Sequence, residues 1–133
     1  MRFMIIGKAT KESEAGVLPK PEEVAAMQKY IAELVKAGVL LAAEGLTPKG
    51  TRVKFSGDKR TVIDGPFIET KELVAGFSII QVKSLEEAIE WVKRAPNTSP
   101  NGEAEVEIRK VMDIEDFGDA FTPNTEIAKV KIT

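Results

Sequence analysis

The fold is decided by the stretch Leu73-Val74-Ala75-Gly76-Phe77-Ser78-Ile79-Ile80-Gln81-Val82-Lys83, which is the strongest predicted strand of the chain. Its two faces carry Phe77, Ile79 and Gln81 on one side and Ser78, Ile80 and Val82 on the other. A strand that is apolar on both faces is covered on both sides in a folded protein. Helices of the same chain can cover one side, but few elements remain for the other. The stretch therefore predicts a sheet whose second face is covered by a partner chain.

The residues before this strand predict a strand, a helix and a second strand. Residues 2–7 are rich in β-formers, and residues 8–20 form a long polar loop with Gly16 and Pro19. Pro21 opens a helix, because proline at the first helical position loses no hydrogen bond, and Gly38 ends it. The apolar run at residues 39–43 has the length of a buried strand.

Two more strands and a second helix complete the pattern. Residues 51–55 and 60–63 alternate around the turn at residues 56–59, which predicts a hairpin. Ser84 and Glu87 have the spacing of a capping box, so a helix begins there and ends before Pro96. Residues 103–112 alternate again, with one strongly charged face. Such a strand faces water or lines a wet cleft.

This order predicts an α+β fold: an antiparallel, ferredoxin-like βαββαβ unit with an inserted β-hairpin and both helices on one face of the sheet. Burying the other face requires a second sheet, so we predict a homodimer of the dimeric α/β barrel type, with two-fold symmetry. Residues 1–118 form the domain. Residues 119–133 form a C-terminal tail that packs on the domain or on the partner, and residues 127–132 are either a short strand or part of that tail.

Composition excludes several kinds of chemistry. The 133 residues contain no Cys and no His, which excludes thiol and His-based nucleophilic catalysis and His- or Cys-ligated metals. The net charge is −2 with no basic stripe, so we expect no nucleic-acid partner. No apolar run is long enough for a membrane span, and we expect a cytoplasmic protein with no membrane partner, no metal and no cofactor. Any catalysis must use carboxylates, Lys, Arg, Tyr30 or hydroxyl groups.

The candidate site residues cluster around the turn at Asp64-Gly65-Pro66. Asp64 is either a catalytic acid or base, or a residue whose carboxylate bonds the backbone of its own turn. The further candidates, all for substrate binding, are Thr70, Lys71, Arg52, Arg109 and Glu44. Arginine binds carboxylates and phosphates with two parallel hydrogen bonds, but Arg52 and Arg109 can equally pair with glutamates of the same sheet.

A family resemblance rests on the nine residues Asp64-Gly65-Pro66-Phe67-Ile68-Glu69-Thr70-Lys71-Glu72. They resemble the DGPFAETKE signature of YCII-related, DGPF-type domain proteins, and further matches at Gly76-Phe77 and at residues 87–91 and 107–111 follow in register. The resemblance implies a dimeric ferredoxin-like fold, and in some relatives a link to extracytoplasmic-function sigma factors. It also implies a His–Asp pair, of which this chain can supply only Asp64.

Two functions follow from these residues. The first is a small-molecule enzyme that uses carboxylate acid/base chemistry in a cleft at the dimer interface, with Asp64 as the acid/base. The second is a non-catalytic ligand-binding or accessory regulatory dimer, linked to sigma-factor signalling. In both, the small-molecule ligand is unknown.

Overall fold

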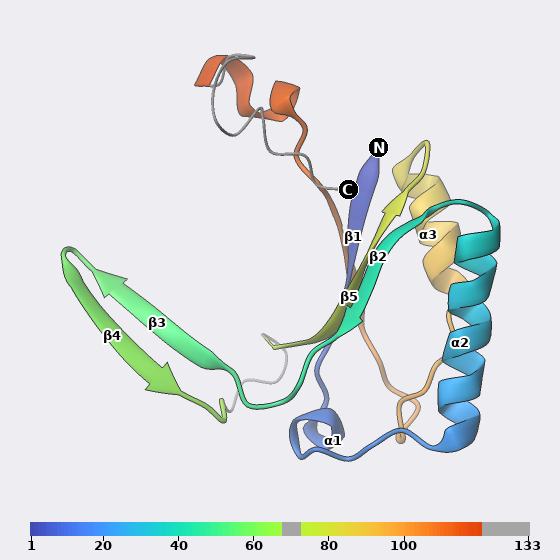
Figure 1. The fold of residues 1–133 in the computed structure, drawn as a ribbon, viewed down its shortest axis with the longest axis horizontal. Helices are drawn as coiled ribbons and strands as arrows, with labels where there is room; N and C mark the ends of the chain where they lie inside the picture. The colour runs from blue at the N-terminus through green and yellow to red at the C-terminus, as the bar shows by residue number, and fades with distance from the viewer. Residues whose placement is uncertain (68–72, 121–133) are drawn as a thin grey trace.

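The structure is a computed structural model of the chain, and it describes residues 1–67 and 73–120 (Figure 1). The elements in order are β1 (Arg2–Lys8), α1 (Lys11–Glu14), α2 (Pro21–Lys36), β2 (Leu40–Gly45), β3 (Thr51–Ser56), β4 (Lys59–Asp64), β5 (Val74–Gln81), α3 (Leu85–Lys93), β6 (Val106–Lys110) and the 3-10 helix η2 (Ile114–Ala120). Four strands form an antiparallel sheet in the order β2-β5-β1-β6, and β3 and β4 pair only with each other. This confirms the mixed α+β class, the antiparallel sheet and the inserted hairpin.

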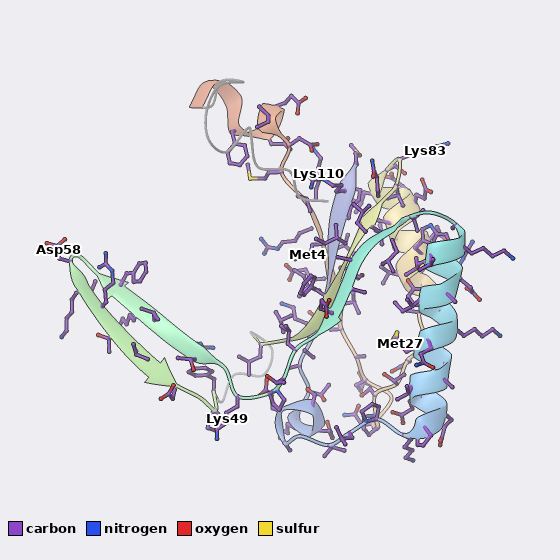
Figure 2. The ribbon with its side chains drawn as sticks, viewed as in Figure 1. Met4, Met27, Lys49, Asp58, Lys83 and Lys110 are labelled. Carbon is purple, nitrogen blue, oxygen red and sulfur yellow. The ribbon has the colours of Figure 1, made fainter. Side chains whose placement is uncertain are left out.

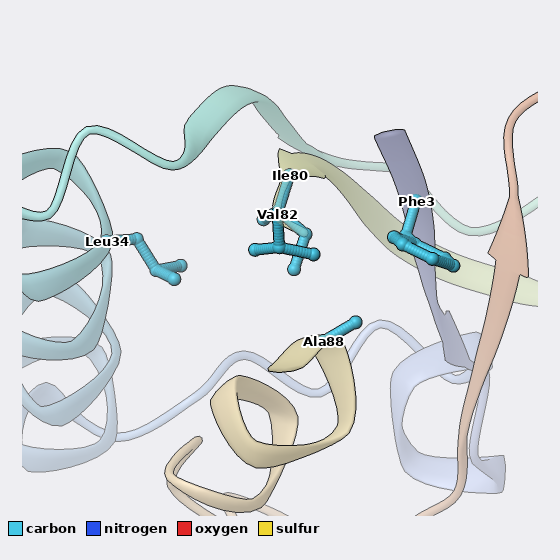
Figure 3. Packing of buried hydrophobic residues seen from close by; sticks show 5 residues of the cluster. All are labelled: Phe3, Leu34, Ile80, Val82 and Ala88. Atoms are coloured by element: carbon cyan, nitrogen blue, oxygen red, sulfur yellow. The ribbon is translucent and has the colours of Figure 1, made fainter. Parts of the chain in front are cut away.

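The core lies between the sheet and the two longer helices. Phe3 of β1 is paired with Ile80 of β5, and these side chains meet Leu34 of α2 and Ala88 of α3 (Figure 3). The hydroxyl of Tyr30 donates a hydrogen bond of 2.7 Å to the backbone oxygen of Trp91, which ties α2 to α3. Both helices therefore cover the same face, as the sequence predicts.

The opposite side of the sheet is the open face, defined by Met4 and Ile6 of β1 and Phe77 and Ile79 of β5. In the register Met4 lies opposite Ile79 and Ile6 lies opposite Phe77, so these residues alternate with those that face the helices. All four are partly exposed. Figure 2 shows Met4 on the side of the sheet away from α2. The predicted second apolar face therefore exists, and the helices α2 and α3 do not cover it.

The β3–β4 hairpin projects away from the rest of the domain, on the side of the open face (Figure 1). All twelve residues of its two strands are exposed. Its foot is closed by a hydrogen bond of 2.8 Å from the Gly65 N–H to the Gly50 oxygen. The turn and strand limits of the hairpin agree with the sequence to within one residue.

The structure corrects the expectation for residues 8–20. Lys8 belongs to β1, and a single turn of helix, α1, follows it. The Thr10 hydroxyl oxygen accepts from the Ser13 N–H at 3.1 Å, and the Ser13 hydroxyl oxygen accepts from the Thr10 N–H at 2.8 Å. This reciprocal cap replaces the missing backbone partners of the helix start, which explains why so short a helix forms inside a polar loop.

Three more boundaries differ from the sequence prediction. β2 extends to Gly45, so Glu44 lies within a strand rather than after it. β6 is limited to Val106–Lys110, whose residues pair with Gly7 to Phe3 of β1. Ser84 caps α3 as predicted, but the Glu87 carboxylate accepts from the Lys83 N–H at 3.0 Å instead of completing the box. The predicted terminal strand at residues 127–132 and the tail after residue 120 lie outside the described residues.

Candidate functional site

A hollow of about 250 Å³ lies at the foot of the hairpin. Lys49, Thr51 and Arg52 line it from the start of the hairpin, and Phe67 lines it from the segment that follows Pro66. We call it the foot hollow. It joins one predicted site residue, Arg52, to the Asp-Gly-Pro-Phe segment, so the sequence signature and the candidate arginine belong to one place in the fold.

Arg52 stacks on an aromatic ring in the foot hollow. Its guanidinium carbon lies 3.7 Å from the centroid of the Phe67 ring. A guanidinium in this position is attracted by the face of the ring, and its N–H donors remain in its own plane, where they can bind a carboxylate or a phosphate. Among the described residues, Arg52 forms no ion pair with a glutamate of the sheet, which was the alternative. Phe67 forms one wall of the hollow.

Asp64 does not line the foot hollow, and the hairpin register places its side chain on the face opposite to that of Arg52. It is paired with Thr51 across the hairpin, and the Thr51 hydroxyl donates a hydrogen bond of 3.1 Å to the Asp64 carboxylate. The carboxylate is therefore held by the opposite strand and not by the backbone of its own turn. Its residue is exposed in the single chain. The role of Asp64 as a catalytic acid or base stays a prediction.

The foot of the hairpin requires glycine at position 65. A Cβ atom there would lie 2.8 Å from the Gly50 oxygen and 3.2 Å from an edge carbon of the Phe67 ring. Lys49, at the rim of the hollow, has a φ of 76°, a left-handed conformation that costs a lysine roughly 1–2 kcal/mol. Close approach and backbone strain thus coincide at the foot hollow, which is a pattern common at functional sites.

A second polar group lies on the open face. Glu107 of β6 forms ion pairs with Arg109 and, at 3.3 Å, with Lys8. The hydrogen bond from Arg109, and next the one from Lys8, lower the pKa of the Glu107 carboxyl below its usual value. Arg109 therefore takes the alternative that the sequence left open, a pair with a glutamate of its own strand. Its role in substrate binding stays a prediction.

Glu44 lies at the opposite edge of the same face. The register places Glu107, Ile6, Phe77 and Glu44 in one row across the sheet, one residue on each of the four strands. Adjacent strands lie about 4.8 Å apart, so Glu44 and Glu107 are separated by about 14 Å. The structure thus does not bring Glu44 and Arg109 together. It places two carboxylates at the two edges of an apolar row.

Two predicted site residues, Thr70 and Lys71, lie outside the described residues. The structure also places Lys8, Lys49 and Thr51 at these sites, and the sequence did not predict any of these three residues. The predicted hairpin register already places Thr51 opposite Asp64, so this partner could have been found. Nothing in the sequence marks Lys49, because its position depends on a backbone conformation that lysine seldom adopts.

Residues 1–67 and 73–120 hold no group of three or more acidic side chains placed to bind a metal ion. Within these residues, no helix has both the length and the hydrophobicity needed to cross a membrane.

The fold and the site define a small α+β domain with a hollow at the foot of an exposed hairpin, and this hollow is lined by Lys49, Arg52, Glu14 and the Phe67 ring. The chain belongs to the YCII-related domain family, whose family model matches residues 1–114. The resemblance to YCII-related proteins expected from the sequence is thereby confirmed. The predicted domain limit at residue 118 stays a prediction.

Two known proteins are similar to this chain. One is the uncharacterized protein R00369 of Rhizobium meliloti (strain 1021), with 33% identity over 92 residues, which are 69% of this chain and 71% of that protein. The other is a solved structure, 5-chloro-2-hydroxyhydroquinone dehydrochlorinase (TftG) from Burkholderia phenoliruptrix AC1100 in complex with 2,5-dihydroxybenzoquinone. It has 17% sequence identity and a TM-score of 0.48, and the match covers 86% of this chain and 97% of that chain.

Proposed function

We propose that this YCII-related domain is a small-molecule enzyme that binds an anionic or polar substrate in the foot hollow. The observation that carries the proposal is the Arg52 guanidinium stacked on Phe67, with Lys49 and Thr51 beside it. Lys49, Arg52 and the Thr47 hydroxyl around an aromatic wall suit a carboxylate or phosphate attached to a small carbon skeleton, and the Glu14 carboxylate on the same lining can accept a hydrogen bond from a donor group of that skeleton. At about 250 Å³ the hollow is smaller than a drug-sized pocket, which favours a small metabolite.

In this proposal Asp64 is the general acid or base. Its carboxylate is one hydrogen bond away from Thr51, a residue that lines the hollow. The chain has no His or Cys, so a carboxylate is the group available for proton transfer near neutral pH. A base of this kind works best when burial raises the pKa of its carboxyl group. Covering of the hairpin foot by a second subunit would supply that burial.

The proposed enzyme is a homodimer with its cleft at the interface. The partly exposed apolar residues of the open face support this arrangement, since a second subunit can cover them. A contiguous apolar patch rimmed by charged residues is typical of an interaction site. Glu107, Arg109 and Glu44 would form that rim.

A second function is a ligand-binding or accessory regulatory dimer without turnover, connected to sigma-factor signalling. The exposure of Asp64 in the single chain favours it, because an active site usually excludes water from its acid or base. The same foot hollow would bind the same class of ligand. The two functions differ only in whether the ligand changes chemically.

A thermal-shift screen against small carboxylates and phosphates tests the proposal. We expect some of these anions to raise the melting temperature of the wild type and to lose that effect in Arg52→Gln. Arg94→Gln is the matched control, because Arg94 also stacks on an aromatic ring, 4.6 Å from the centroid of Trp91, but lies at the end of α3. An equal shift in Arg52→Gln and in the wild type would refute the foot hollow as the site.

Mass spectrometry of each stabilising ligand then separates the two functions. The enzyme converts the ligand, and Asp64→Asn binds it without converting it. If the wild type returns every stabilising ligand unchanged, the regulatory function stands instead.

A further inference from the structure

The hairpin has one apolar and one basic face. Directly opposed residues of an antiparallel pair share a face, so Val53 and Val62 lie together, next to Phe55 and Arg60. Val53 is 54% exposed, Val62 is 65% exposed and Phe55 is 69% exposed. The basic face carries Arg52, Lys54 and Lys59 together with Ile63, and the apolar face also carries Arg60, whose guanidinium carbon lies 4.3 Å from the centroid of the Phe55 ring. An apolar stripe on a projecting arm is a surface that another molecule can cover.

The hairpin also needs a cover for its own stability. A two-stranded hairpin is at best marginally stable in water by itself. Here β3 and β4 pair only with each other, and all of their residues are exposed. Packing against a second surface would increase the stability of the hairpin.

The charge of the hairpin indicates which molecule binds to it. Residues 49–64 contain five basic and two acidic side chains, a net charge of +3. The whole chain carries −2, so the remaining residues carry −5. A basic arm on an acidic body is complementary to the body of a second copy. Glu44, at one edge of the open face, supplies negative charge next to apolar residues, whereas Glu107 at the other edge is paired with Lys8 and Arg109.

The surface area of the chain supports the same occupant. A compact 14.5 kDa protein exposes about 6,900 Å², whereas this chain exposes 10034 Å². If residues 68–72 and 121–133 are assigned the full surface of an unfolded chain, about 2,900 Å², the rest of the chain still exposes about 7,100 Å², whereas a compact protein of that smaller mass exposes about 6,200 Å², so that roughly 1,000 Å² is in excess. A standard interface takes about 800 Å² from each partner. The excess is thus what one protomer of a dimer needs to bury.

We propose that the β3–β4 hairpin is an arm that docks on the open face of a second copy of this chain, with Val53, Phe55 and Val62 seated on it. The hairpin projects on the side toward which the open face points, so an arm from each protomer can reach its partner (Figure 1). The inference rests on the homodimer of the proposed function. It adds that the foot hollow of one protomer lies against the sheet of the other, so that two chains build each site.

Two single substitutions on adjacent residues test the arm. Val62→Lys and Thr61→Lys add the same charge to the same strand, but their side chains lie on opposite faces of the hairpin. Both positions are exposed in the single chain, so both variants should fold, which circular dichroism checks. Sedimentation equilibrium measures the dissociation constant of the dimer. We expect Val62→Lys to weaken the dimer by at least about tenfold, because it buries an unpaired charge, and Thr61→Lys to change it by less than about threefold.

Photo-crosslinking locates the contact. With a benzophenone amino acid at Phe55, we expect covalent dimers whose cross-linked peptides come from β1 and β5. The same group at Lys29, on α2, is the control and should give no covalent dimer.

The outcomes separate this inference from the proposed function. A wild-type dimer that Val62→Lys and Thr61→Lys weaken equally, or that cross-links from Phe55 to the helices, overturns the arm but not the dimer. A stable dimer has a dissociation constant below about 50 μM. A wild type that stays monomeric at that concentration overturns both the arm and the dimeric cleft. Neither readout involves the ligand, so the Arg52→Gln result is judged independently.

Discussion

The substitution Gly65→Ala tests how the foot of the hairpin is built. The added Cβ atom would lie 2.8 Å from the Gly50 oxygen and within 3.3 Å of two carbons of the Phe67 ring. The backbone must move, and the 2.8 Å hydrogen bond between Gly65 and Gly50 is strained or lost. The lost bond costs about 1 kcal/mol and overpacking costs about 1–3 kcal/mol. We therefore expect at least about 2 kcal/mol of local destabilisation.

Amide hydrogen exchange measures this effect where it occurs. At 2 kcal/mol, protection of the hairpin amides should fall by about 30-fold, since 1.4 kcal/mol is a factor of ten. Amides of β1 and β5 should keep their protection, because they belong to the separate four-stranded sheet.

Gly45→Ala is the matched control. Its Cβ would meet no heavy atom within 4 Å, and its φ is not in the left-handed region. We expect unchanged protection in this variant. If Gly65→Ala also leaves hairpin protection and the Arg52-dependent ligand shift unchanged, the close approach at the foot does not shape the hollow and the reasoning is refuted.

Three other predictions concern stability. Leu34→Ala should lower the free energy of unfolding by about 2–5 kcal/mol in urea, whereas Val35→Ala should change it by less than about 0.5 kcal/mol, because Leu34 is 1% exposed and Val35 is 60% exposed; equal losses would contradict the assigned core face of α2. Tyr30→Phe should cost about 1–2 kcal/mol by removing the 2.7 Å bond to Trp91, and a variant as stable as the wild type would show that this bond does not hold α2 to α3. The pKa of the Glu107 carboxyl is lowered in the folded chain from its ordinary value of 4.5. The stabilisation that Glu107 contributes is therefore present above pH 4.5 and is lost as the pH falls through the folded pKa. Glu107→Gln should flatten the pH dependence of the melting temperature in that range, and an unchanged profile would exclude the Glu107 ion pairs as the source of that dependence.

Local features of this chain could be read from the sequence because they depend on neighbouring residues. Alternation marks both strands of the hairpin and the two faces of β5. Pro21 and Gly38 mark the ends of α2, because each residue has a backbone preference of its own. The apolar spacing in α2 is a weaker guide: it includes Val35, which the structure leaves mostly in water. Spacing gives the approximate face of a helix, but packing selects the residues that are buried.

The candidate site shows the same division. Asp64 and Arg52 were candidates by residue type, and the hairpin register explains why Asp64 meets Thr51. The stacking of Arg52 on Phe67 joins two residues fifteen positions apart, and no pattern in the sequence indicates it. The capping of α1 by Thr10 and Ser13 was equally hidden, because it uses a serine where the usual signal has glutamate or glutamine.

The sequence by itself determined the family, the order of the elements and the two-sided apolar character of β5, since these depend on residue type and periodicity along the chain. Only the tertiary structure decided that the hairpin projects on the side of the sheet away from α2 and α3, and that a hollow at its foot is lined by Arg52 and Phe67. Those facts depend on how distant segments meet in space. The close approach of Gly65 to Gly50, and the stacking of the Arg52 guanidinium on the Phe67 ring, arise only once the chain has folded.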